Sequence, residues 1–412
     1  MAEYVRRHLE GELREAFGWT KALLLVGGRQ VGKTTLLRHV FPELKMVTFD
    51  PVTDTMGARA NPELFLETLK GPAILDEVQY APELFPALKR RMDAAGNTGQ
   101  YVLSGSQNPL LLKQVAESLA GRVAVYELEG YSMAERSGEG GAGKPWLARF
   151  LANGGRWEGV EPVSRESGEG LMEVLWKGGL PEAARMPERF AKRYMASYVR
   201  TYLERDARVA GNVSDLAALG RFLGLCAAMS GQEINRSQFG REAGVSPATA
   251  EKWLGVMRAT FQWRESTPWK GNAIKRVTGK SKGYVADTGL MAHLLGISSP
   301  VALLASPQRG AVFETFVAGE IRKQLQGSGE TAGAYHWRTN GGAEVDFVLE
   351  RDGVLHPFEA KCTERLGAYD LRGIKAFRAT YRDAVGEGGV IYAGREVYRL
   401  DEQTLAIPWC AV

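Results

Sequence analysis

The sequence predicts an α/β protein whose first third forms a parallel sheet with helices on both of its faces. Over residues 1–135, short apolar runs alternate with helix-like segments; the runs are 22–26, 45–49, 72–75, 101–105 and 123–128. This alternation is typical of βαβ units, in which a helix connects each strand to the next. A glycine-rich loop after the first run is the second observation. Because ligands bind such sheets at the carboxyl ends of the strands, the polar residues that follow each run are informative.

The loop after the first run fits the pattern G-x-x-x-x-G-K-[ST] within the stretch LLLVGGRQVGKTTLLRHV. Backbone N–H groups must wrap a polyphosphate closely, and a Cβ at the glycines would block that approach. The following helix presents its positive N-terminal end to the anion. The alternative is a glycine turn before an ordinary helix. We expect the loop to bind a nucleotide through Gly27, Gly28, Arg29, Gln30, Val31, Gly32, Lys33, Thr34 and Thr35.

The side chains around this loop have separate expected roles. Lys33 can reach the β- and γ-phosphates, and the Thr34 hydroxyl can ligate Mg²⁺. The third run ends in Asp76 and Glu77. We expect Asp76 to hold Mg²⁺ through its water shell and Glu77 to polarise the attacking water. The alternative is a pair of acids at a strand exit without a role. After the fourth run, Ser106 is the candidate sensor of the γ-phosphate.

Composition limits the class of protein. A chain of 412 residues can bury the cores of two to four domains. Its net charge of +4 is too small to indicate a nucleic-acid partner by itself. No apolar run has the length of a membrane span, so no membrane partner is expected. The three cysteines are widely spaced and the five histidines form no metal-ligand cluster, which favours a reducing, cytoplasmic setting.

The central part of the chain has first a glycine-rich composition and then a helical pattern. Residues 136–170 are rich in glycine, serine and charge, with one apolar island, PWLARFLA, and predict a linker or insertion. Residues 171–214 predict a helical segment. Along it Phe190, Tyr194, Tyr198 and Tyr202 recur every four residues, which indicates core packing more often than a cofactor site.

Residues 215–300 predict a winged-helix domain. Two helices flank a tight turn at 243–246, with Pro247 at the first position of the second helix. The next segment suits a β-hairpin wing, and from Arg264 to Lys282 it holds six basic residues and one acid, an excess of 6 − 1 = 5. The alternative is a fold that packs only against protein. We expect DNA phosphates to be contacted by Lys270, Lys275, Arg276, Lys280 and Lys282.

Residues 301–412 predict a second chemical site. Glu314 lies on the apolar face of a predicted helix, where a carboxylate needs a partner. Two strand-like runs follow, AEVDFVL with Asp346 and HPFEAKC with Glu359 and Lys361 on one face. Three carboxylates would repel one another without a divalent cation. We expect two of the acids to hold Mg²⁺ or Mn²⁺ and Lys361 to orient the activated water or to offset developing phosphorane charge. The alternatives are an edge strand without a role, or a site that keeps its shape without turnover.

Several motifs together resemble one known family: GGRQVGKTT, ILDEVQ, SGSQNPLL, ESLAGRV, YVRTYLERD, ADTGL, EVDFVLE and PFEAK. The chain resembles the prokaryotic AAA-type (AAA+) ATPases with a C-terminal domain of unknown function. The resemblance implies a P-loop ATPase, a winged helix and a domain similar to PD-(D/E)XK nucleases. It maps Walker A to Gly27–Thr34 and Walker B to Asp76–Glu77. In the nuclease pattern Glu314 is the helix acid, Asp346 and Glu359 are the metal acids and Lys361 is the lysine.

The resemblance also implies ATP as the cofactor and a homo-oligomeric ring, commonly of six subunits, in which a neighbour's arginine completes each site. Arg122, in SLAGRV, is a candidate for reading the nucleotide state. The glycine-rich stretch at 136–170 departs from the tighter family pattern.

The expected domains are 1–135 for the ATPase core, 136–170 for the linker or insertion, 171–214 for the helical segment, 215–300 for the winged helix and 301–412 for the nuclease-like domain. We expect a motor that uses ATP hydrolysis to remodel or move along duplex or branched DNA, with a C-terminal domain that cuts or grips. The alternative is an ATP-dependent regulatory switch, in signalling or defence, without strand cleavage. A third, weaker possibility is a structural DNA-binding protein whose ATPase only gates assembly.

Overall fold

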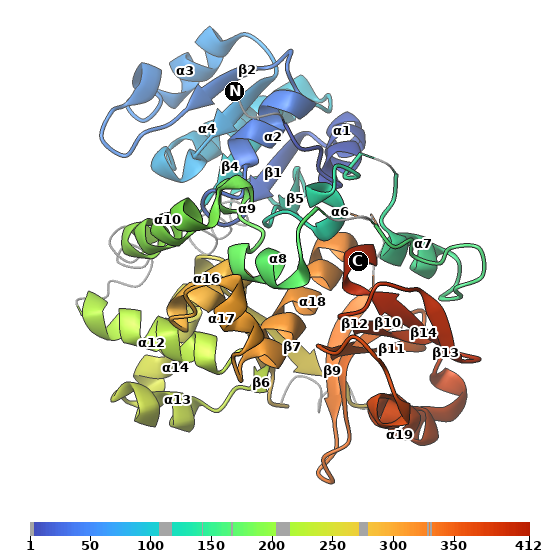
Figure 1. The fold of residues 1–412 in the computed structure, drawn as a ribbon. Coiled ribbons are helices and arrows are strands. Elements are labelled where there is room, and N and C mark those ends of the chain that lie inside the picture. Colours follow the sequence, from blue (N-terminus) through green and yellow to red (C-terminus); the bar gives the residue numbers. More distant parts are fainter. Residues whose placement is uncertain are drawn as a thin grey trace. The chain divides into compact units, whose positions relative to one another are not determined.

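The computed structural model describes residues 4–106, 118–141, 143–165, 168–202, 215–271, 279–327, 329 and 332–412 (Figure 1). The chain divides into two compact units. The N-terminal unit comprises Arg7–Gly130 and Ala259–Phe261, and the C-terminal unit comprises Met1–Arg6, Tyr131–Arg258 and Gln262–Val412. Within the described ranges, no helix is both long and apolar enough to cross a membrane.

The N-terminal unit contains a five-stranded sheet in the order β2-β3-β4-β1-β5. Every neighbouring pair in it is parallel, which confirms the predicted parallel sheet. The strands are β1 Ala22–Val26, β2 Lys45–Thr48, β3 Ala73–Asp76, β4 Tyr101–Gly105 and β5 Val123–Glu127, and the helices are α1 Leu9–Trp19, α2 Lys33–Val40, α3 Pro62–Leu69 and α4 Leu84–Ala95. Each of the five apolar runs is thus a strand.

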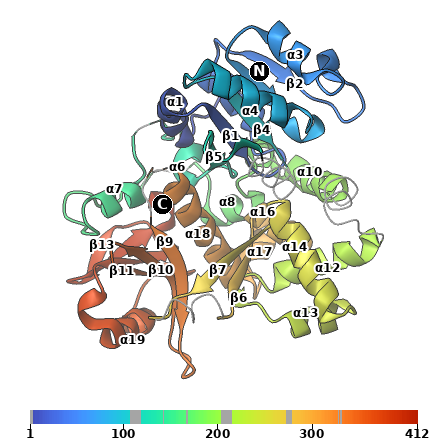
Figure 2. The same cartoon turned by 180° about the vertical axis from the view of Figure 1, so that it is seen from behind.

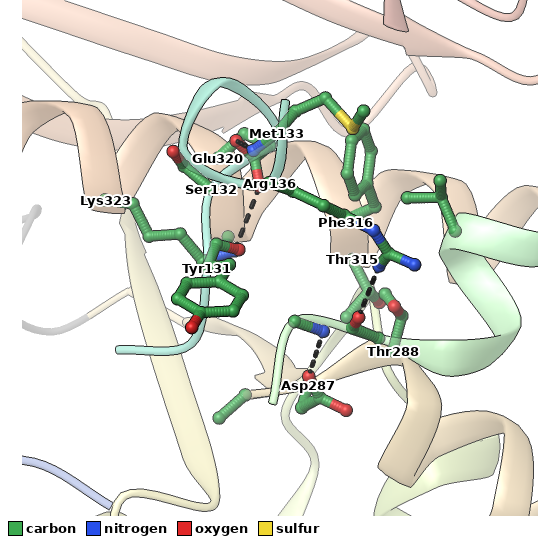
Figure 3. Close-up of a pocket in the computed structure, with 15 residues that line it drawn as sticks. Tyr131, Ser132, Met133, Arg136, Asp287, Thr288, Thr315, Phe316, Glu320 and Lys323 are labelled. Atoms are coloured by element: carbon green, nitrogen blue, oxygen red, sulfur yellow. Dashed lines mark hydrogen bonds and ion pairs between the residues drawn. The ribbon is translucent and has the colours of Figure 1, made fainter. Parts of the chain in front are cut away.

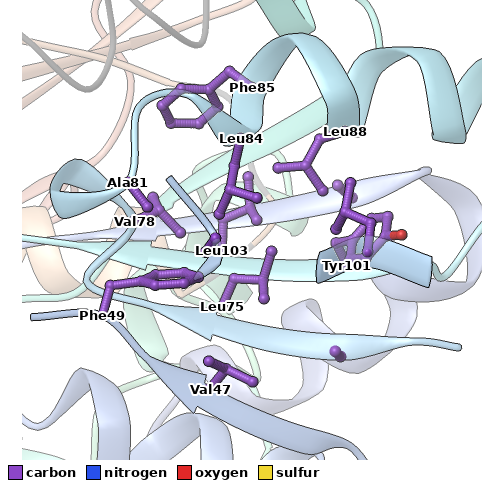
Figure 4. Close-up of a cluster of buried hydrophobic side chains, with 14 of the residues drawn as sticks. Val47, Phe49, Leu75, Val78, Ala81, Leu84, Phe85, Leu88, Tyr101 and Leu103 are labelled. Carbon is purple, nitrogen blue, oxygen red and sulfur yellow. The ribbon is translucent and has the colours of Figure 1, made fainter. Parts of the chain in front are cut away.

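Both faces of this sheet are covered. On one face, Val47, Leu75 and Leu103 of the strands meet Leu84 and Leu88 of α4, and all are buried (Figure 4). Alternate residues of a strand point to opposite faces. On the other face of β1, Leu23 and Leu25 are also fully buried, and α1 lies against β1 and α2. Burial on both faces is what allows an uninterrupted apolar strand such as ALLLV.

The C-terminal unit holds a nine-stranded sheet, in the order β13-β14-β12-β11-β10-β9-β7-β8-β6. The strands β9, β10 and β11 form an antiparallel meander, and β11, β12 and β14 run parallel. Strand bounds are β6 Gln232–Glu233, β7 Trp263–Pro268, β8 Lys282–Val285, β9 Gly333–Arg338, β10 Glu344–Arg351, β11 Val354–Lys361, β12 Gly388–Tyr392, β13 Tyr398–Asp401 and β14 Thr404–Pro408.

The α-helices of the described part of this unit are α6 Met133–Arg136, α7 Trp146–Ala152, α8 Leu171–Lys177, α9 Pro181–Arg185, α10 Glu188–Thr201, α12 Leu216–Ala228, α13 Arg236–Ala243, α14 Pro247–Ala259, α16 Thr288–Leu294, α17 Pro300–Leu304, α18 Arg309–Gln326 and α19 Arg372–Tyr381. Helices α12, α13 and α14 lie together in both views (Figure 2).

The helix–turn–helix segment forms where the sequence predicts it. Helix α13 ends at Gly244, which has φ +69° and therefore suits glycine. Ser246 accepts the Thr249 N–H at 3.1 Å and so caps α14, which begins at Pro247. The strands β7 and β8 then pair antiparallel. The hairpin is not a free wing, however, because the far end of β7 pairs with β9 and joins the C-terminal sheet.

The described part of residues 136–170 differs from the expected linker. Trp157 is fully buried, stacks on Phe150 at a centroid distance of 4.1 Å and meets Phe358 of β11 edge-on. Its Nε1 donates to the Gly388 carbonyl at 2.9 Å. Contacts among three buried aromatic side chains, Phe150, Trp157 and Phe358, hold the segment in place although its composition is rich in glycine. This segment is therefore part of the core of the C-terminal unit.

Candidate functional site

The phosphate-loop pattern forms a tight turn between β1 and α2. Gly27 has φ +152° and Gly32 has φ +95°. A Cβ on Gly27 would lie 2.2 Å from the Leu128 carbonyl oxygen, so this position requires glycine for its close approach as well as its backbone angle. Lys33 and Thr34 are the first residues of α2, whose N-terminal N–H groups form the anion-binding end of the helix.

Lys33 is folded over the loop. Its side chain is almost fully buried, and its Nζ donates to the carbonyl oxygens of Gly27 at 3.0 Å and Gly28 at 2.9 Å. Both acceptors are neutral. Phosphate oxygens carry negative charge, so the ammonium would be attracted to them more strongly than to these carbonyls. The lysine therefore fits the role of a phosphate ligand for ATP.

Thr34 and Asp76 fit the Mg²⁺ that accompanies the nucleotide. Thr34 Oγ1 donates to Asp76 Oδ2 at 2.9 Å, and Ser104, at the end of β4, donates to Asp76 Oδ1. The carboxylate is 2% exposed at the carboxyl end of β3. Hydroxyl, carboxylate and water oxygens are the ligands that Mg²⁺ prefers. When bound, Mg²⁺ would neutralise charge on the phosphates.

Glu77 lies beside this pair in a left-handed backbone conformation, with φ +57°. Such a conformation is strained for a residue with a side chain and often occurs at functional sites. Glu77 Oε2 accepts bonds from Ser106 Oγ at 3.2 Å and from Gln79 Nε2, and Gln79 Nε2 lies 3.3 Å from Ser106 Oγ. The expected water-polarising acid and the expected sensor therefore lie together at the exits of β3 and β4.

The second group of predicted residues also comes together, within the C-terminal unit. Lys361 Nζ lies 2.6 Å from Glu359 Oε2 and 3.9 Å from Asp346 Oδ2. Asp346 Oδ2 accepts the Ala360 N–H at 3.0 Å. Glu314, on α18, approaches from another element and joins this group through a further lysine.

That lysine is Lys282, and its predicted role as a DNA contact is wrong. Its side chain is 1% exposed, and its Nζ lies 3.0 Å from Glu314 Oε1 and 3.3 Å from Asp346 Oδ1. It also pairs with Glu344. An ammonium enclosed by carboxylates cannot reach a nucleic-acid backbone. We call Lys282, Glu314, Glu344, Asp346, Glu359 and Lys361 the carboxylate–lysine cluster.

The carboxyl groups of this cluster differ in pKa. Burial raises the pKa of Glu314 to about 7, and the nearby Asp346 charge adds to the effect. Burial also raises the pKa of Glu359 well above its usual range. For Asp346 burial acts in the same direction, but Lys282 and Lys361 outweigh it and lower its pKa to about 2. Asp346 is thus the anion around which the two ammonium groups are placed.

The predicted Mg²⁺ or Mn²⁺ site does not fit this arrangement. Among the described residues, no group of three or more His, Cys, Asp or Glu side chains is placed to hold a metal ion. The predicted acids are present and converge, but an ammonium lies between Glu314 and Asp346.

Comparisons with known proteins agree with the first of these two sites. Residues 20–137 match the family described as AAA domain, and 168–301 and 309–412 match two domains of unknown function, DUF8612 and DUF4143. The uncharacterized protein Rv2008c of Mycobacterium tuberculosis is 31% identical over 408 residues, which cover 98% of this chain and 83% of that protein. Mb2031c of Mycobacterium bovis matches equally. The chain belongs to this family of AAA-type ATPases.

Two solved structures match this chain at low sequence identity. A Walker-type ATPase of Pyrococcus abyssi is 15% identical, with a TM-score of 0.45, covering 71% of this chain and 98% of that one. A RuvB structure from Thermotoga maritima is 17% identical, with a TM-score of 0.30, covering 66% of this chain and 91% of that one.

Arg122, the candidate for reading the nucleotide state, lies away from the nucleotide loop of this ATPase. It precedes the first residue of β5, whereas the phosphate loop follows the last residue of β1, and these strands are parallel. The two positions are therefore at opposite ends of these neighbouring strands. Arg122 instead forms a two-bond ion pair with Asp93, at 2.7 and 2.9 Å, and its hydrogen bonds to this carboxylate raise the pKa of Arg122.

Two residues of the ATPase site were missed from sequence. Arg7 is buried and donates to the carbonyl oxygens of Val31 at 3.0 Å, Glu129 at 2.7 Å and Gly130 at 3.2 Å. It thereby ties the phosphate loop to the segment that follows β5. Gln79 is the second, through its bond to Glu77. Its only sequence signal is its place in ILDEVQ, and Arg7 has no signal beyond a basic residue near a predicted helix.

The segment GGLP, residues 178–181, and the motif ADTGL, residues 286–290, meet at a small pocket in the C-terminal unit (Figure 3). Asp287 accepts the N–H groups of Gly179 at 2.7 Å and Leu290 at 2.9 Å, which caps α16. Arg136 donates to the Gly178 carbonyl at 2.8 Å. On another side of the pocket, buried Glu320 accepts the Met133 N–H at 2.9 Å. These side chains form hydrogen bonds with backbone groups around the pocket where the two segments meet. The two segments therefore have a structural role.

The remaining predicted DNA contacts are only partly described. Lys270, just after β7, and Lys280, just before β8, are exposed, and Lys275 and Arg276 lie outside the described residues. Two arginines of α13 and α14 are paired with acids. Glu251 lies 2.5 Å from Arg236 and 2.6 Å from Arg258, and Arg258 also lies 2.6 Å from Glu265.

Proposed function

We propose that this AAA-type ATPase uses ATP hydrolysis to remodel duplex or branched DNA or to move along it. In this proposal Lys33 binds the β- and γ-phosphates, Thr34 and Asp76 provide the Mg²⁺ ligands, and Glu77 accepts a proton from, or orients, the attacking water. Ser106 and Gln79 fix the Glu77 carboxylate at the strand exits. The positive end of α2 complements the phosphate charge.

The observation that carries the DNA part is the order α13, tight turn, α14 and hairpin, with exposed lysines just after β7 and just before β8. In helix–turn–helix proteins the second helix enters the major groove with its N-terminal residues against the bases. The first turn of α14 is exposed at Pro247 and Ala248, as this docking requires. Lys270 and Lys280 would then contact backbone phosphates.

A second candidate function is an ATP-dependent regulatory switch whose helix–turn–helix binds protein. The ion pairs of Glu251 with Arg236 and Arg258 favour it, because they neutralise the basic groups that a DNA-binding surface would present. The two functions differ in what ATP turnover responds to. Turnover that increases with DNA supports the first, and turnover indifferent to DNA supports the second.

The C-terminal domain grips DNA in this proposal and does not cut it, because its acids surround an internal lysine. A homo-oligomeric ring, in the six-subunit form that the family resemblance implies, completes the proposal. A neighbouring subunit would supply the arginine that stabilises transition-state charge. The mass of the assembly in solution with and without ATP tests this part.

The DNA surface is tested by replacing Lys270, Lys275, Arg276 and Lys280 with alanine. A matched control removes the same charge from exposed residues elsewhere, namely Lys70, Lys89, Lys375 and Arg395. Affinity for linear, forked and four-way DNA is measured from 50 to about 200 mM salt. The logarithmic salt slope should fall by about 0.9 for each phosphate that the first variant no longer neutralises, and it should stay near the parent value in the control. Equal slopes in the two variants would place the DNA-binding surface elsewhere.

A further inference from the structure

Lys282 has as many carboxylate partners as its ammonium group has N–H donors. A lysine has three N–H donors and no acceptor. Three carboxylates, those of Glu314, Glu344 and Asp346, lie within ion-pair distance of its Nζ. They come from α18 and β10, whereas Lys282 comes from β8, so three elements of the C-terminal unit converge on one positive charge.

The neighbouring groups leave little capacity for another cation. Asp346 uses Oδ1 for Lys282, while its Oδ2 accepts the Ala360 N–H. Glu314 Oε1 accepts from both Lys282 and the Tyr284 hydroxyl, each at 3.0 Å. Glu359 Oε2 is bound to Lys361. Mg²⁺ needs near-octahedral oxygen ligands at about 2.0–2.1 Å. An ammonium already placed between two of the acids occupies the volume that such an ion would need.

We propose that Lys282 is the resident cation of this cluster and takes the place of a divalent metal ion. The C-terminal domain then retains the acid and lysine positions of a phosphodiester-cleaving site without binding its metal. This inference goes beyond the proposed function and holds whether or not the chain acts on DNA. It also explains why a lysine from the basic hairpin segment is buried: its charge neutralises acids that would otherwise repel one another.

The test counts Mn²⁺ ions bound by the full chain in nucleotide-free buffer, by equilibrium dialysis with detection of free Mn²⁺ by electron paramagnetic resonance. Four proteins are compared: the parent, Asp346→Asn, Lys282→Met and the Lys282→Met/Asp346→Asn double variant. Methionine keeps much of the lysine stem and removes the charge. Any Mn²⁺ bound at the phosphate loop contributes equally to all four counts. A difference between two counts therefore gives the number of ions bound at the carboxylate–lysine cluster.

The parent and Asp346→Asn should bind the same number of ions. Lys282→Met should bind one more, and the double variant should lose it again. Mn²⁺ should also raise the unfolding temperature of Lys282→Met by more than that of the parent. A parent that binds one ion more than Asp346→Asn overturns the inference, as does a folded Lys282→Met that gains none. If Lys282→Met does not fold, the comparison of the parent with Asp346→Asn decides alone.

Discussion

Thr34 and Asp76 are joined by a hydrogen bond of 2.9 Å, which links the phosphate loop after β1 to the carboxyl end of β3. The strand β4 lies between them in the sheet, and its Ser104 donates to the same carboxylate. Three strand ends therefore converge on one acid. This convergence accounts for the pattern of the sequence, in which a glycine-rich loop and an acidic pair follow separate apolar runs.

Replacing Lys33 with alanine should abolish ATP hydrolysis. The variant loses a buried ammonium whose bonds to phosphate oxygens are charge-assisted, each worth about 1.5–3 kcal/mol. We expect nucleotide affinity to fall at least about tenfold, measured with a fluorescent ATP analogue beside steady-state turnover. Lys45→Ala is the matched control, because this exposed lysine begins β2, which β3 and β4 separate from β1 in the sheet. Normal turnover by Lys33→Ala would refute the assignment of the loop.

Replacing Glu77 with glutamine should separate binding from chemistry. A proton-transfer or water-orienting residue typically contributes about 10²- to 10⁴-fold to the rate. We expect kcat to fall in this range while ATP affinity stays near the parent value, because Lys33 and the loop are untouched. The exposed Glu43 provides the control variant, Glu43→Gln, with unchanged kcat. If ATP affinity and kcat fall together in Glu77→Gln, the side chain supports the loop and does not act on water.

The N-terminal fold and the nucleotide loop could be predicted because their signals are local. The glycine spacing and the lysine–threonine pair lie within a few residues of one another, and Asp76 is recognised from the apolar run that it directly follows. The burial of Lys282 could not be predicted in this way. Its partners are 32, 62 and 64 residues away in the chain, and a count of local charge does not distinguish an exposed lysine from a neutralised one. The same holds for Trp157, whose partner Gly388 is 231 residues away.

Replacing Trp157 with alanine should destabilise the C-terminal unit by about 3–5 kcal/mol, the usual cost of truncating a large buried aromatic side chain. The variant loses the stack on Phe150 and the bond to the Gly388 carbonyl. Denaturant-induced unfolding followed by tryptophan fluorescence and circular dichroism measures the change. Val163 is 71% exposed, so Val163→Ala should change stability by less than about 0.5 kcal/mol. A cost below about 1 kcal/mol for Trp157→Ala would show that residues 143–165 do not belong to the core.

Acidification should destabilise the C-terminal unit through His336. Burial, with Lys282 nearby, lowers the pKa of His336 to about 4. The unfolded chain, with a histidine pKa of about 6.5, binds the proton more readily. Stability is therefore full above about pH 6.5 and falls as the pH decreases toward 4. Between pH 6.5 and 5 the free energy of unfolding decreases by about 2 kcal/mol.

His336→Gln should reduce the slope of unfolding free energy against pH in this window. His39→Gln, which changes an exposed histidine on α2, should keep the parent slope. Unfolding curves at intervals between pH 7.5 and 4.5 provide the comparison. A slope that is the same in all three proteins would mean that the His336 imidazole is protonated as readily in the folded protein as in the unfolded chain.

The measurement that tests the account most directly is the rate of ATP hydrolysis with and without DNA. At about 50 mM salt, saturating linear, forked or four-way DNA should raise turnover several-fold in the parent. The increase should be lost in the variant lacking Lys270, Lys275, Arg276 and Lys280, whose turnover without DNA should equal that of the parent. Turnover that no DNA structure changes, in a protein that hydrolyses ATP and loses this activity in Lys33→Ala, would contradict the proposed action on DNA.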